Sequence, residues 1–397
     1  MVIQLHTNNI TDLLNLQGVK QDKIKYSKNL VEVWISCPVK EHICPCCKAA
    51  TSRVHDYYKR SFNHIIIGER TSRIYYKQRR YLCTNCGKRF AESNSFVEKF
   101  YRHSNEVVNS VFKNLKDMRN FSQIGKDNNM SSQNVIRLMS KFIPIFHHTT
   151  HLPEAIGIDE FRGNAGGNKF QVAITDLKTH KVIDVISART EDAIRHFFRN
   201  ISNTKEVKLV TMDLSLFFKN IILDTFQNAK IVADTFHYTR LMHWALDNVR
   251  KDVQKGLPKD MRIYFKRSRS VLHKRIDELD IDQYQQLCRM LDYDENLRWA
   301  YSIVQKLFEI IDEENADKKV VLFKEFMTYA SNCDLTEFNK HLQTYFKWHK
   351  YIINSFYTNY SNGITEGLNT KIKTLKRISF GFRNFNNFRL RILMACS

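Results

Sequence analysis

Proline, glycine and long apolar runs are scarce in this chain. Its 397 residues include only 12 glycines and 5 prolines, which leaves little room for long flexible linkers. No apolar run approaches the ~20 residues that cross a bilayer, so we expect no membrane contact. Residues 1–16 lack a basic start followed by a long apolar stretch, which argues against a signal peptide. The sequence therefore predicts a cytosolic protein of two or three folded domains.

Acidic residues are also scarce relative to basic ones. Asp and Glu number 41 and Lys and Arg number 62, which gives a formal charge of +21. A solvated basic surface is one explanation of this surplus. Its spread over most segments instead favours a polyanionic partner, because phosphate contacts supply most of the non-specific affinity for DNA. We therefore expect nucleic acid to be the partner of this chain.

The nine cysteines predict a metal site rather than disulfides, because thiols stay reduced in the cytosol. Cys44 with Cys47 and Cys83 with Cys86 form two Cys-x-x-Cys knuckles. Each knuckle turns tightly enough for two thiolates to reach one tetrahedral Zn²⁺. We therefore predict that these four cysteines bind a single structural Zn²⁺.

The segment between the two knuckles is predicted to be a β-hairpin. Residues 62–67 and 73–82 are rich in β-forming side chains, and residues 68–71 supply a turn. A hairpin returns its ends to the same place, which would bring the knuckles together. Cys37 and Cys46 are possible substitute ligands. Basic side chains interleave with aromatic ones around this hairpin and suit contacts with phosphates and bases. The predicted DNA contacts are Arg79, Arg80, Lys88 and Arg89.

Residues 104–142 have a helical pattern. A short helix around 121–126 is followed by a turn at 128–130 and by a further helix, which Ser131-Ser132 can cap. Two short helices joined by a tight turn are the helix-turn-helix arrangement, although such pairs occur in proteins of every kind. The second helix would present polar side chains to a major groove. These are Gln133, Asn134 and Arg137.

Beyond Pro153 the pattern alternates between strands and helices. Strands are predicted at 155–158, 170–175, 182–187, 207–212 and 230–233, and helices at 190–201 and 216–226. Three early strands followed by alternating helix and strand indicate a mixed α/β sheet with helices on its faces. Ligands of such sheets gather at the carboxyl ends of the strands, where Asp159, Asp213 and Asp234 fall.

A glutamate, Glu366, can join these aspartates in a metal site. After His237 the sequence is helical as far as about residue 355, and Glu366 then lies in a turn that runs into a helix. Clustered carboxylates repel one another unless divalent cations neutralise them, and hard cations prefer oxygen ligands. Two such cations can clamp the attacking and leaving oxygens of a phosphoryl transfer. The basic residues that would surround the phosphate are Lys371, Lys373, Lys376 and Arg377.

In their order along the chain, these motifs resemble those of one known family. The matching residues are Cys44-Pro45-x-Cys47, Arg79-Arg80-Tyr81-x-Cys83-x-x-Cys86-Gly87-Lys88-Arg89-Phe90, Ile158-Asp159-Glu160-Phe161, Asp213, Ala233-Asp234-x-Phe236-His237, Gly363-x-x-Glu366-Gly367-x-Asn369 and Gly381-Phe382-Arg383-Asn384-Phe385. The chain resembles bacterial insertion-sequence transposases of the ISL3 type, whose DDE catalytic domain has the ribonuclease H-like fold. The resemblance covers nearly the whole chain.

This resemblance implies a function, cofactors and partners. It implies that Asp159, Asp213 and Glu366 bind Mg²⁺ or Mn²⁺ and catalyse DNA cleavage and strand transfer. It also implies N-terminal modules that bind terminal inverted repeats, transfer into target DNA, a homodimer or larger assembly on DNA, and a place in the bacterial cytoplasm at the nucleoid. The expected parts are a zinc-binding module at 1–100, a helix-turn-helix segment at 101–145, a ribonuclease H-like domain at 154–240 and 356–397, and a helical insertion at 241–355.

The identity of the second acid and the exact function stay open. Asp213 and Asp234 both close strands, and each could meet Asp159. In the ribonuclease H-like order the strand of the second acid pairs with the first strand, and neighbouring strands are ~4.8 Å apart. We therefore expect Asp213 to complete the triad, and Asp234 with His237 to support it. A structure-selective nuclease and a DNA-binding regulator of transposase origin are the alternative functions.

Overall fold

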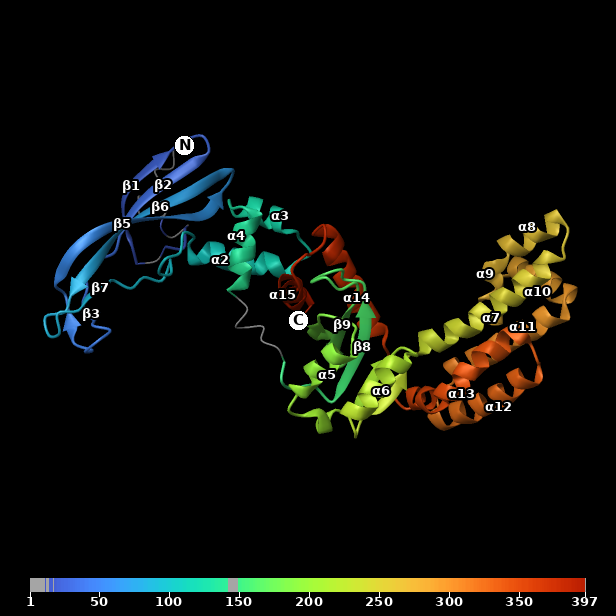
Figure 1. Ribbon diagram of the computed structural model, residues 1–397. Coiled ribbons are helices and arrows are strands. Elements are labelled where there is room, and N and C mark those ends of the chain that lie inside the picture. Colours follow the sequence, from blue (N-terminus) through green and yellow to red (C-terminus); the bar gives the residue numbers. More distant parts are fainter. Residues whose placement is uncertain (1–10, 12–13, 17, 142–148, 397) are drawn as a thin grey trace. The chain divides into compact units, whose positions relative to one another are not determined.

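The computed structural model describes residues 11, 14–16, 18–141 and 149–396 (Figure 1). These residues form two compact units. The first contains the described residues up to Lys141 together with Leu375–Phe382 and Asn386–Ala395, and the second contains the residues from Thr149 to Thr374 together with Arg383–Phe385. None of the described helices combines the length and the apolar character that a membrane span needs.

The first unit begins with a five-stranded sheet. Its strands are β1 (Lys20–Tyr26), β2 (Leu30–Ser36), β5 (Val54–Ile67), β6 (Arg70–Leu82) and β7 (Arg89–Ala91). They lie in the order β1-β2-β6-β5, with β7 paired to β6. Val33, Ile35 and Ile74 are fully buried in its core. The predicted hairpin is confirmed as the antiparallel pair of β5 and β6, which extends beyond the predicted bounds. Strands β1 and β2 were not predicted.

Three short helices complete the N-terminal part of this unit: α2 (Asn105–Lys116), α3 (Phe121–Asp127) and α4 (Ser132–Ser140). Each has a side-chain cap that satisfies a backbone N–H of its first turn. Ser104 caps α2, Asn120 caps α3 and Ser131 caps α4, in each case by accepting from the third residue beyond it. The predicted cap at Ser131 and the two predicted helices are therefore present.

The C-terminal helix α15 (Phe385–Cys396) packs with these three helices. Leu390 and Met394 lie in their hydrophobic core, and the fully buried Arg391 donates to the carbonyl oxygen of Asp117 at 2.7 Å. Most of α15 thus belongs to the first unit. The sequence placed all of 356–397 with the catalytic domain, and the structure divides that range between the two units.

The second unit contains the mixed sheet that the sequence predicts. Its strands are β8 (Ala155–Phe161), β9 (Gln171–Asp176), β10 (Lys181–Ile186), β11 (Leu209–Met212) and β12 (Lys230–Ala233), in the order β10-β9-β8-β11-β12. β9 is antiparallel to both of its neighbours, whereas β8, β11 and β12 run parallel. Helices α5 (Glu191–Arg199) and α6 (Leu216–Thr225) pack on this sheet through one hydrophobic core. The mixed α/β class is confirmed, with one correction: β8 continues through Asp159 to Phe161.

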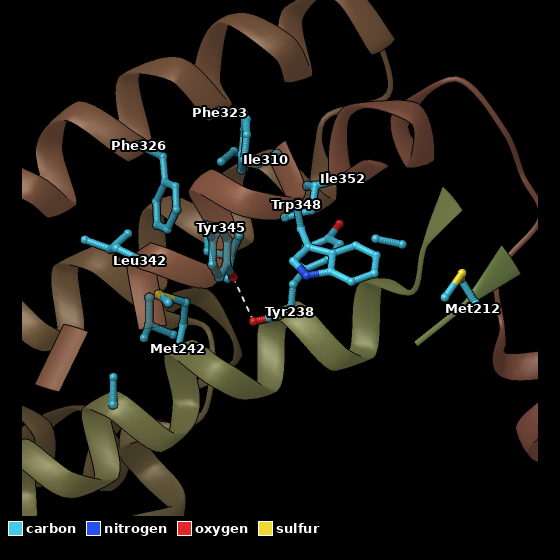
Figure 2. Close-up of a cluster of buried hydrophobic side chains, with 14 of the residues drawn as sticks. Met212, Tyr238, Met242, Ile310, Phe323, Phe326, Leu342, Tyr345, Trp348 and Ile352 are labelled. Atoms are coloured by element: carbon cyan, nitrogen blue, oxygen red, sulfur yellow. Dashed lines mark hydrogen bonds between the residues drawn. The ribbon is translucent and has the colours of Figure 1, made fainter. Parts of the chain in front are cut away.

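A helical segment lies between β12 and α14 (Gly363–Ile378) in the chain. Its helices are α7 (Thr235–Lys255), α8 (Lys259–Arg267), α9 (Arg269–Leu272), α10 (Ile281–Tyr293), α11 (Glu295–Asp312), α12 (Ala316–Asn332) and α13 (Thr336–Phe356). Figure 2 shows the aromatic core that joins α7 to α12 and α13, with Tyr345 and Trp348 at its centre. The buried Tyr345 hydroxyl donates to the carbonyl oxygen of Tyr238 at 2.7 Å. This packing fixes the start of α7, where Asp234 and His237 lie.

Candidate functional site

Two aspartates lie next to each other at one edge of the second sheet. Asp159 lies within β8, and Asp213 directly follows β11. β8 and β11 are parallel neighbours with Ile158 opposite Met212, so the residues that follow these two are one strand spacing apart, about 4.8 Å. Asp234 follows β12, which lies on the far side of β11. The strand order therefore makes Asp213, and not Asp234, the neighbour of Asp159.

Helix α14 brings Glu366 to the same edge because β8 has a glycine at the contact point. A Cβ atom at Gly157 would lie 2.2 Å from Thr365 Oγ1 and 2.5 Å from Thr175 Oγ1. The two threonine hydroxyls hydrogen-bond at 2.8 Å, and both residues are fully buried. Only a residue without a side chain lets α14 approach the sheet this closely. Glu366 follows Thr365 and is held at the carboxylate edge by this contact.

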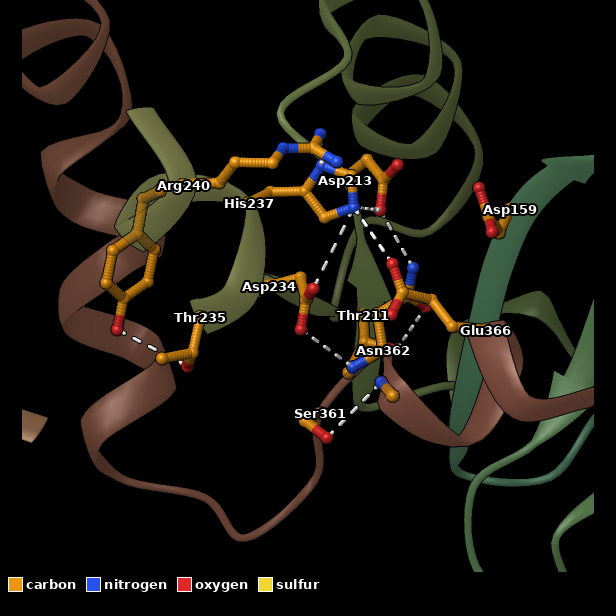
Figure 3. Close-up of polar contacts among 12 residues, drawn as sticks. Asp159, Thr211, Asp213, Asp234, Thr235, His237, Arg240, Ser361, Asn362 and Glu366 are labelled. Carbon is orange, nitrogen blue, oxygen red and sulfur yellow. Dashed lines mark hydrogen bonds and ion pairs between the residues drawn. The ribbon is translucent and has the colours of Figure 1, made fainter. Parts of the chain in front are cut away.

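His237 links the carboxylates that meet there (Figure 3). Its Nε2 lies 3.0 Å from Asp213 Oδ1, 3.2 Å from Glu366 Oε1 and 4.0 Å from Asp234 Oδ2. Arg240 Nη2 lies 2.9 Å from His237 Nδ1. A guanidinium group only donates hydrogen bonds, so Nδ1 accepts and Nε2 carries the proton that faces the carboxylates. The structure thus brings Asp213, Glu366, Asp234 and His237 together.

Burial makes the carboxylates of this site reluctant to ionise. Desolvation raises the pKa of Asp159 to about 7, and the negative charge of Asp213 adds to this effect. Desolvation likewise raises the pKa of Asp234 to about 6 and raises the pKa of Asp213, while His237 opposes it at both residues. A bound cation would remove this penalty, because it stabilises the ionised form.

The donor atoms of the site suit a hard divalent cation. Asp159, Asp213 and Glu366 offer carboxylate oxygens, and the buried Asp234 Oδ2 accepts no hydrogen bond from the part of the chain that the structure describes. Asp213, Asp234 and His237 each have a ligand atom within 4.8 Å of the others. Sets that are rich in carboxylate oxygen favour Mg²⁺ and Mn²⁺ over softer metals.

An open cavity of about 480 Å³ lies over this edge of the sheet. Asp159, Asp213 and His237 line it together with two arginines, Arg189 and Arg240. Guanidinium groups match the geometry of phosphate oxygens and carry a permanent positive charge. Arg189 is ion-paired with Glu160, which also lines the cavity. The cavity therefore combines carboxylates that can hold cations with two arginines beside them.

The four predicted zinc ligands come together in the first unit. Cys44 Sγ lies 3.6 Å from Cys86 Sγ, and Cys47 Sγ lies 3.5 Å from Cys83 Sγ. All four sulfurs lie within 4.8 Å of one another, and a tetrahedral site with Zn–S bonds of ~2.3 Å needs about 3.8 Å between sulfurs. Hydrogen bonding to the Ala49 N–H lowers the pKa of Cys47 to about 6, which favours the thiolate that binds metal.

The local backbone forms two matching turns around this cysteine cluster. The first knuckle lies between the short strands β3 (His42–Ile43) and β4 (Ala50–Thr51), and the second lies between β6 and β7. Gly87 closes the second knuckle at a φ of 70°, which few other residues adopt. Of the two possible substitute ligands, Cys46 is exposed and Cys37 contacts the Tyr76 hydroxyl at 3.4 Å. Neither belongs to the cluster.

Two protein-family models match this chain. A family model for transposases of the ISL3 DDE type matches residues 156–392. That match covers more than half of the chain and contains Asp159, Asp213 and Glu366. The chain belongs to the ISL3 family of transposases. A second family model, the zinc-finger of transposase IS204/IS1001/IS1096/IS1165, matches residues 40–86, which contain the four clustered cysteines. Both families imply DNA as a partner, and the cysteine cluster with its family match supports Zn²⁺.

Two curated proteins are similar in sequence to this ISL3-family chain. The transposase for insertion sequence element IS1001 of Bordetella parapertussis is 21% identical over 392 residues, which are 96% of this chain and 95% of the relative. A protein described as an ATP-dependent protease from Lactococcus lactis subsp. lactis is 37% identical over 107 residues, which are 27% of this chain and 33% of that protein. The first match extends over both units, whereas the second is local and transfers no activity.

The predicted DNA contacts of the zinc-bearing sheet are not equally accessible. Lys88 and Arg89 are exposed beside the cysteine cluster, and Arg80 is exposed but ion-paired. Arg79 is only 8% exposed, and its guanidinium group pairs with Glu92 at 3.3 Å. The prediction for Arg79 is therefore corrected: this side chain stabilises the interior of the sheet and does not face a ligand.

The other predicted contacts lie on two helices. On α4, Gln133 and Arg137 are exposed and Asn134 is half-buried. On α14 the four basic residues are mostly exposed; they are Lys371, Lys373, Lys376 and Arg377, with Lys376 half-buried. Lys371 and Lys373 belong to the unit that contains the carboxylates, and the other two belong to the first unit.

Sequence reasoning assigned no role to four polar residues of the site. Arg189 follows β10 and reaches the cavity from a distant part of the chain, for which no local pattern exists. Arg240 lies one helical turn after His237, on the same face of α7, which is a usable signal. Asn369 lies three residues after Glu366 on the face that the helical period already marks, and Asn362 lies in the turn directly before the helix.

Proposed function

We propose that this chain is the transposase of an insertion sequence, which binds terminal inverted repeats, cleaves DNA at the element ends and joins them to target DNA. Asp159, Asp213 and Glu366 form its catalytic triad. One observation carries this proposal: two of these acids lie on neighbouring strands, and a helix packed against Gly157 brings the third to the same edge. Family membership supports the reaction class.

In this proposal Asp159, Asp213 and Glu366 hold Mg²⁺ or Mn²⁺. Such ions, when bound, activate the attacking oxygen and neutralise the leaving one. The residues of the chain supply the remaining functions. Arg189 and Arg240 provide positive charge at the cavity for a phosphodiester. The Nε2–H of His237 faces Asp213 and Glu366 and orients both carboxylates. Asp234 lies beside His237 and supports the triad.

We further infer how the units divide the work. The sheet order β10-β9-β8-β11-β12, antiparallel on one side and parallel on the other, supports a ribonuclease H-like domain with α7–α13 as its insertion. α3 and α4 act as a helix-turn-helix, with Gln133, Asn134 and Arg137 directed at a major groove. Lys88 and Arg89 add phosphate contacts beside the zinc cluster. The chain works as a homodimer or larger assembly on DNA, because an element has two ends.

A strand-transfer assay tests this function. The purified chain is incubated with Mg²⁺, a target plasmid and linear duplexes that carry the inverted repeats flanking its gene. The proposal predicts cleavage at the repeat ends and joined products that require the repeat sequence. Cleavage without joining would indicate a structure-selective nuclease. Binding without cleavage would indicate a regulator, and either result contradicts the proposal.

A further inference from the structure

Two buried asparagines flank Glu366 where α14 meets the sheet, one directly before the helix and one within it. Asn362 is fully buried, and Asn369 is 2% exposed. Asn369 lies three residues after Glu366 on the same side of the helix, and Asn362 lies in the turn directly before the first helical residue. Buried amides are rare unless hydrogen bonds satisfy them. The bonds that these two make therefore indicate what they do.

Each asparagine donates its amide to a different member of the triad. Asn369 Nδ2 donates to Asp159 Oδ2 at 2.7 Å, and the Glu160 N–H donates to the other oxygen of that carboxylate, also at 2.7 Å. Asn362 Nδ2 donates to Asp213 Oδ1 at 3.0 Å. The two bonds join segments that are 210 and 149 residues apart in the chain. α14 therefore supplies Glu366 and contacts Asp159, and the residue directly before the helix contacts Asp213.

Further contacts fix the orientation of Asn362. Its Oδ1 accepts from the Thr211 hydroxyl of β11 at 3.4 Å, and its backbone N–H donates to Asp234 Oδ1 at 3.3 Å (Figure 3). With Oδ1 used as an acceptor, Nδ2 is the atom that faces Asp213. Asn362 thus makes hydrogen bonds at the ends of both β11 and β12.

Asn369 is placed at a cost that packing alone does not explain. Its Oδ1 is buried and accepts no hydrogen bond among the described residues. An unsatisfied buried oxygen destabilises a fold, and an apolar residue of similar size would avoid that penalty. The hydrogen bond to Asp159 therefore explains why a polar side chain occupies this position.

A neutral amide suits this role better than a charged donor would. Carboxylates that share a cation repel each other, and hydrogen bonds from neighbouring groups hold them in one orientation. An amide N–H holds one lone pair of a carboxylate and leaves the others for a cation, whereas a lysine or arginine would neutralise the charge that attracts the cation. One amide on α14 and one directly before its first residue fix both aspartates relative to Glu366.

We propose that Asn369 and Asn362 are positioning residues, which hold Asp159 and Asp213 in the orientations that bind divalent cations. This inference rests on the proposed function, because it takes the triad to be the cation site. The amides touch neither DNA nor the reacting atoms; they act through the two aspartates.

Mn²⁺ binding to the full-length, DNA-free chain tests this role without measuring activity. Free Mn²⁺ is followed by electron paramagnetic resonance during titration of the wild type, Asn369→Ala, Asp159→Ala and the double variant. We expect Asn369→Ala to weaken Mn²⁺ binding about tenfold or more. In the Asp159→Ala background the same substitution should have no measurable effect. Thr370→Ala is the matched control, since Thr370 is exposed on the same helix and its hydroxyl donates to the Glu366 carbonyl oxygen.

The double-mutant cycle of Asn369→Ala and Asp159→Ala separates a positioning role from a general structural effect. Equal weakening of Mn²⁺ binding in both backgrounds, or wild-type affinity in Asn369→Ala, overturns the inference. Asn362→Ala with Asp213→Ala gives a second, independent cycle, and metal-free melting curves identify variants that fail to fold. If Asp159→Ala itself leaves Mn²⁺ affinity unchanged, the proposed cation site is wrong as well. If Asp159→Ala weakens binding and Asn369→Ala does not, only the positioning role is wrong.

Discussion

Replacing Gly157 with alanine should disable the site without touching any carboxylate. The added Cβ would lie 2.2 Å from Thr365 Oγ1 and 2.5 Å from Thr175 Oγ1, whereas real Cβ contacts stay above 3.0 Å. α14 must therefore move away from β8 by close to 1 Å, because the atoms in the way belong to buried side chains that hydrogen-bond to each other. Glu366 moves with the helix.

The size of the effect follows from this displacement. A misplacement of about 1 Å in a catalytic group can lower the rate about 100-fold. Overpacking of a buried contact costs about 1–3 kcal/mol, which corresponds to a Tm drop of roughly 2–4 °C per kcal/mol for a domain of this size. We therefore expect Gly157→Ala to lose about two orders of magnitude in cleavage rate while the protein stays folded.

The assay is cleavage of DNA that carries the repeat ends, measured beside DNA binding and thermal melting. Binding should be largely preserved, because the predicted contacts Lys88, Arg89, Gln133 and Arg137 lie outside α14, the helix that moves. Gly256→Ala is the control: Gly256 has an ordinary φ of −80°, and a Cβ there would make only an ordinary contact at 3.8 Å. Adding Thr175→Ala and Thr365→Ala to Gly157→Ala should recover part of the cleavage rate. A Gly157→Ala variant that cuts at the wild-type rate would refute this account of how α14 is positioned.

Three further outcomes are expected. Metal analysis should find about one zinc per chain, and Cys83→Ser should lose it together with the fold of the first unit; a zinc-free but fully folded first unit would contradict the cluster. The double variant Lys88→Ala, Arg89→Ala should weaken DNA binding and reduce its salt dependence by about two ions. A gel-shift series over salt concentration measures both effects, and an unchanged salt slope would show that these residues do not contact phosphate. Folding raises the pKa of Asp159 to about 7 and of Asp234 to about 6 from an unfolded value near 3.9. The metal-free chain should therefore lose stability progressively as pH rises from about 4 to about 7. Mg²⁺ should then raise the Tm more at pH 8 than at pH 5.5, and an equal gain at both would contradict cation binding at these groups.

Much of the second unit could be predicted because its strands are short, apolar and separated by clear helical patterns. Their buried faces leave only one good interpretation of runs such as 207–212 and 230–233. The strand that carries Asp159 was predicted too short, since the polar Asp159-Glu160 pair interrupts an apolar run although β8 continues through it. Backbone pairing with β9 decides that extension, and pairing is not a local property of the sequence.

Other features depend on contacts between distant segments. The burial of Arg79 follows from Glu92, which lies on the far side of the second cysteine knuckle. The packing of α15 with α2, α3 and α4 depends on the buried Arg391 and a few apolar residues. Arg240 and Asn362 carried signals that were available and not used, namely their spacing from His237 and from Glu366; the helical period placed Asn369 on the face of Glu366, but its hydrogen bond to Asp159 was not predicted. A carboxylate that must stay ionised in a buried site needs such a donor, and the helix face shows where to look for it.

The most direct test of the catalytic triad compares Asp213→Asn with Asp234→Asn in cleavage of repeat-bearing DNA by the full chain, with Mg²⁺ and with Mn²⁺. Asp213 follows the strand beside Asp159, whereas Asp234 lies one strand further away. Asp213→Asn should therefore abolish cleavage and leave DNA binding intact, and Asp234→Asn should keep reduced but measurable cleavage. If Asp213→Asn still cuts and Asp234→Asn does not, the assignment of the triad is contradicted.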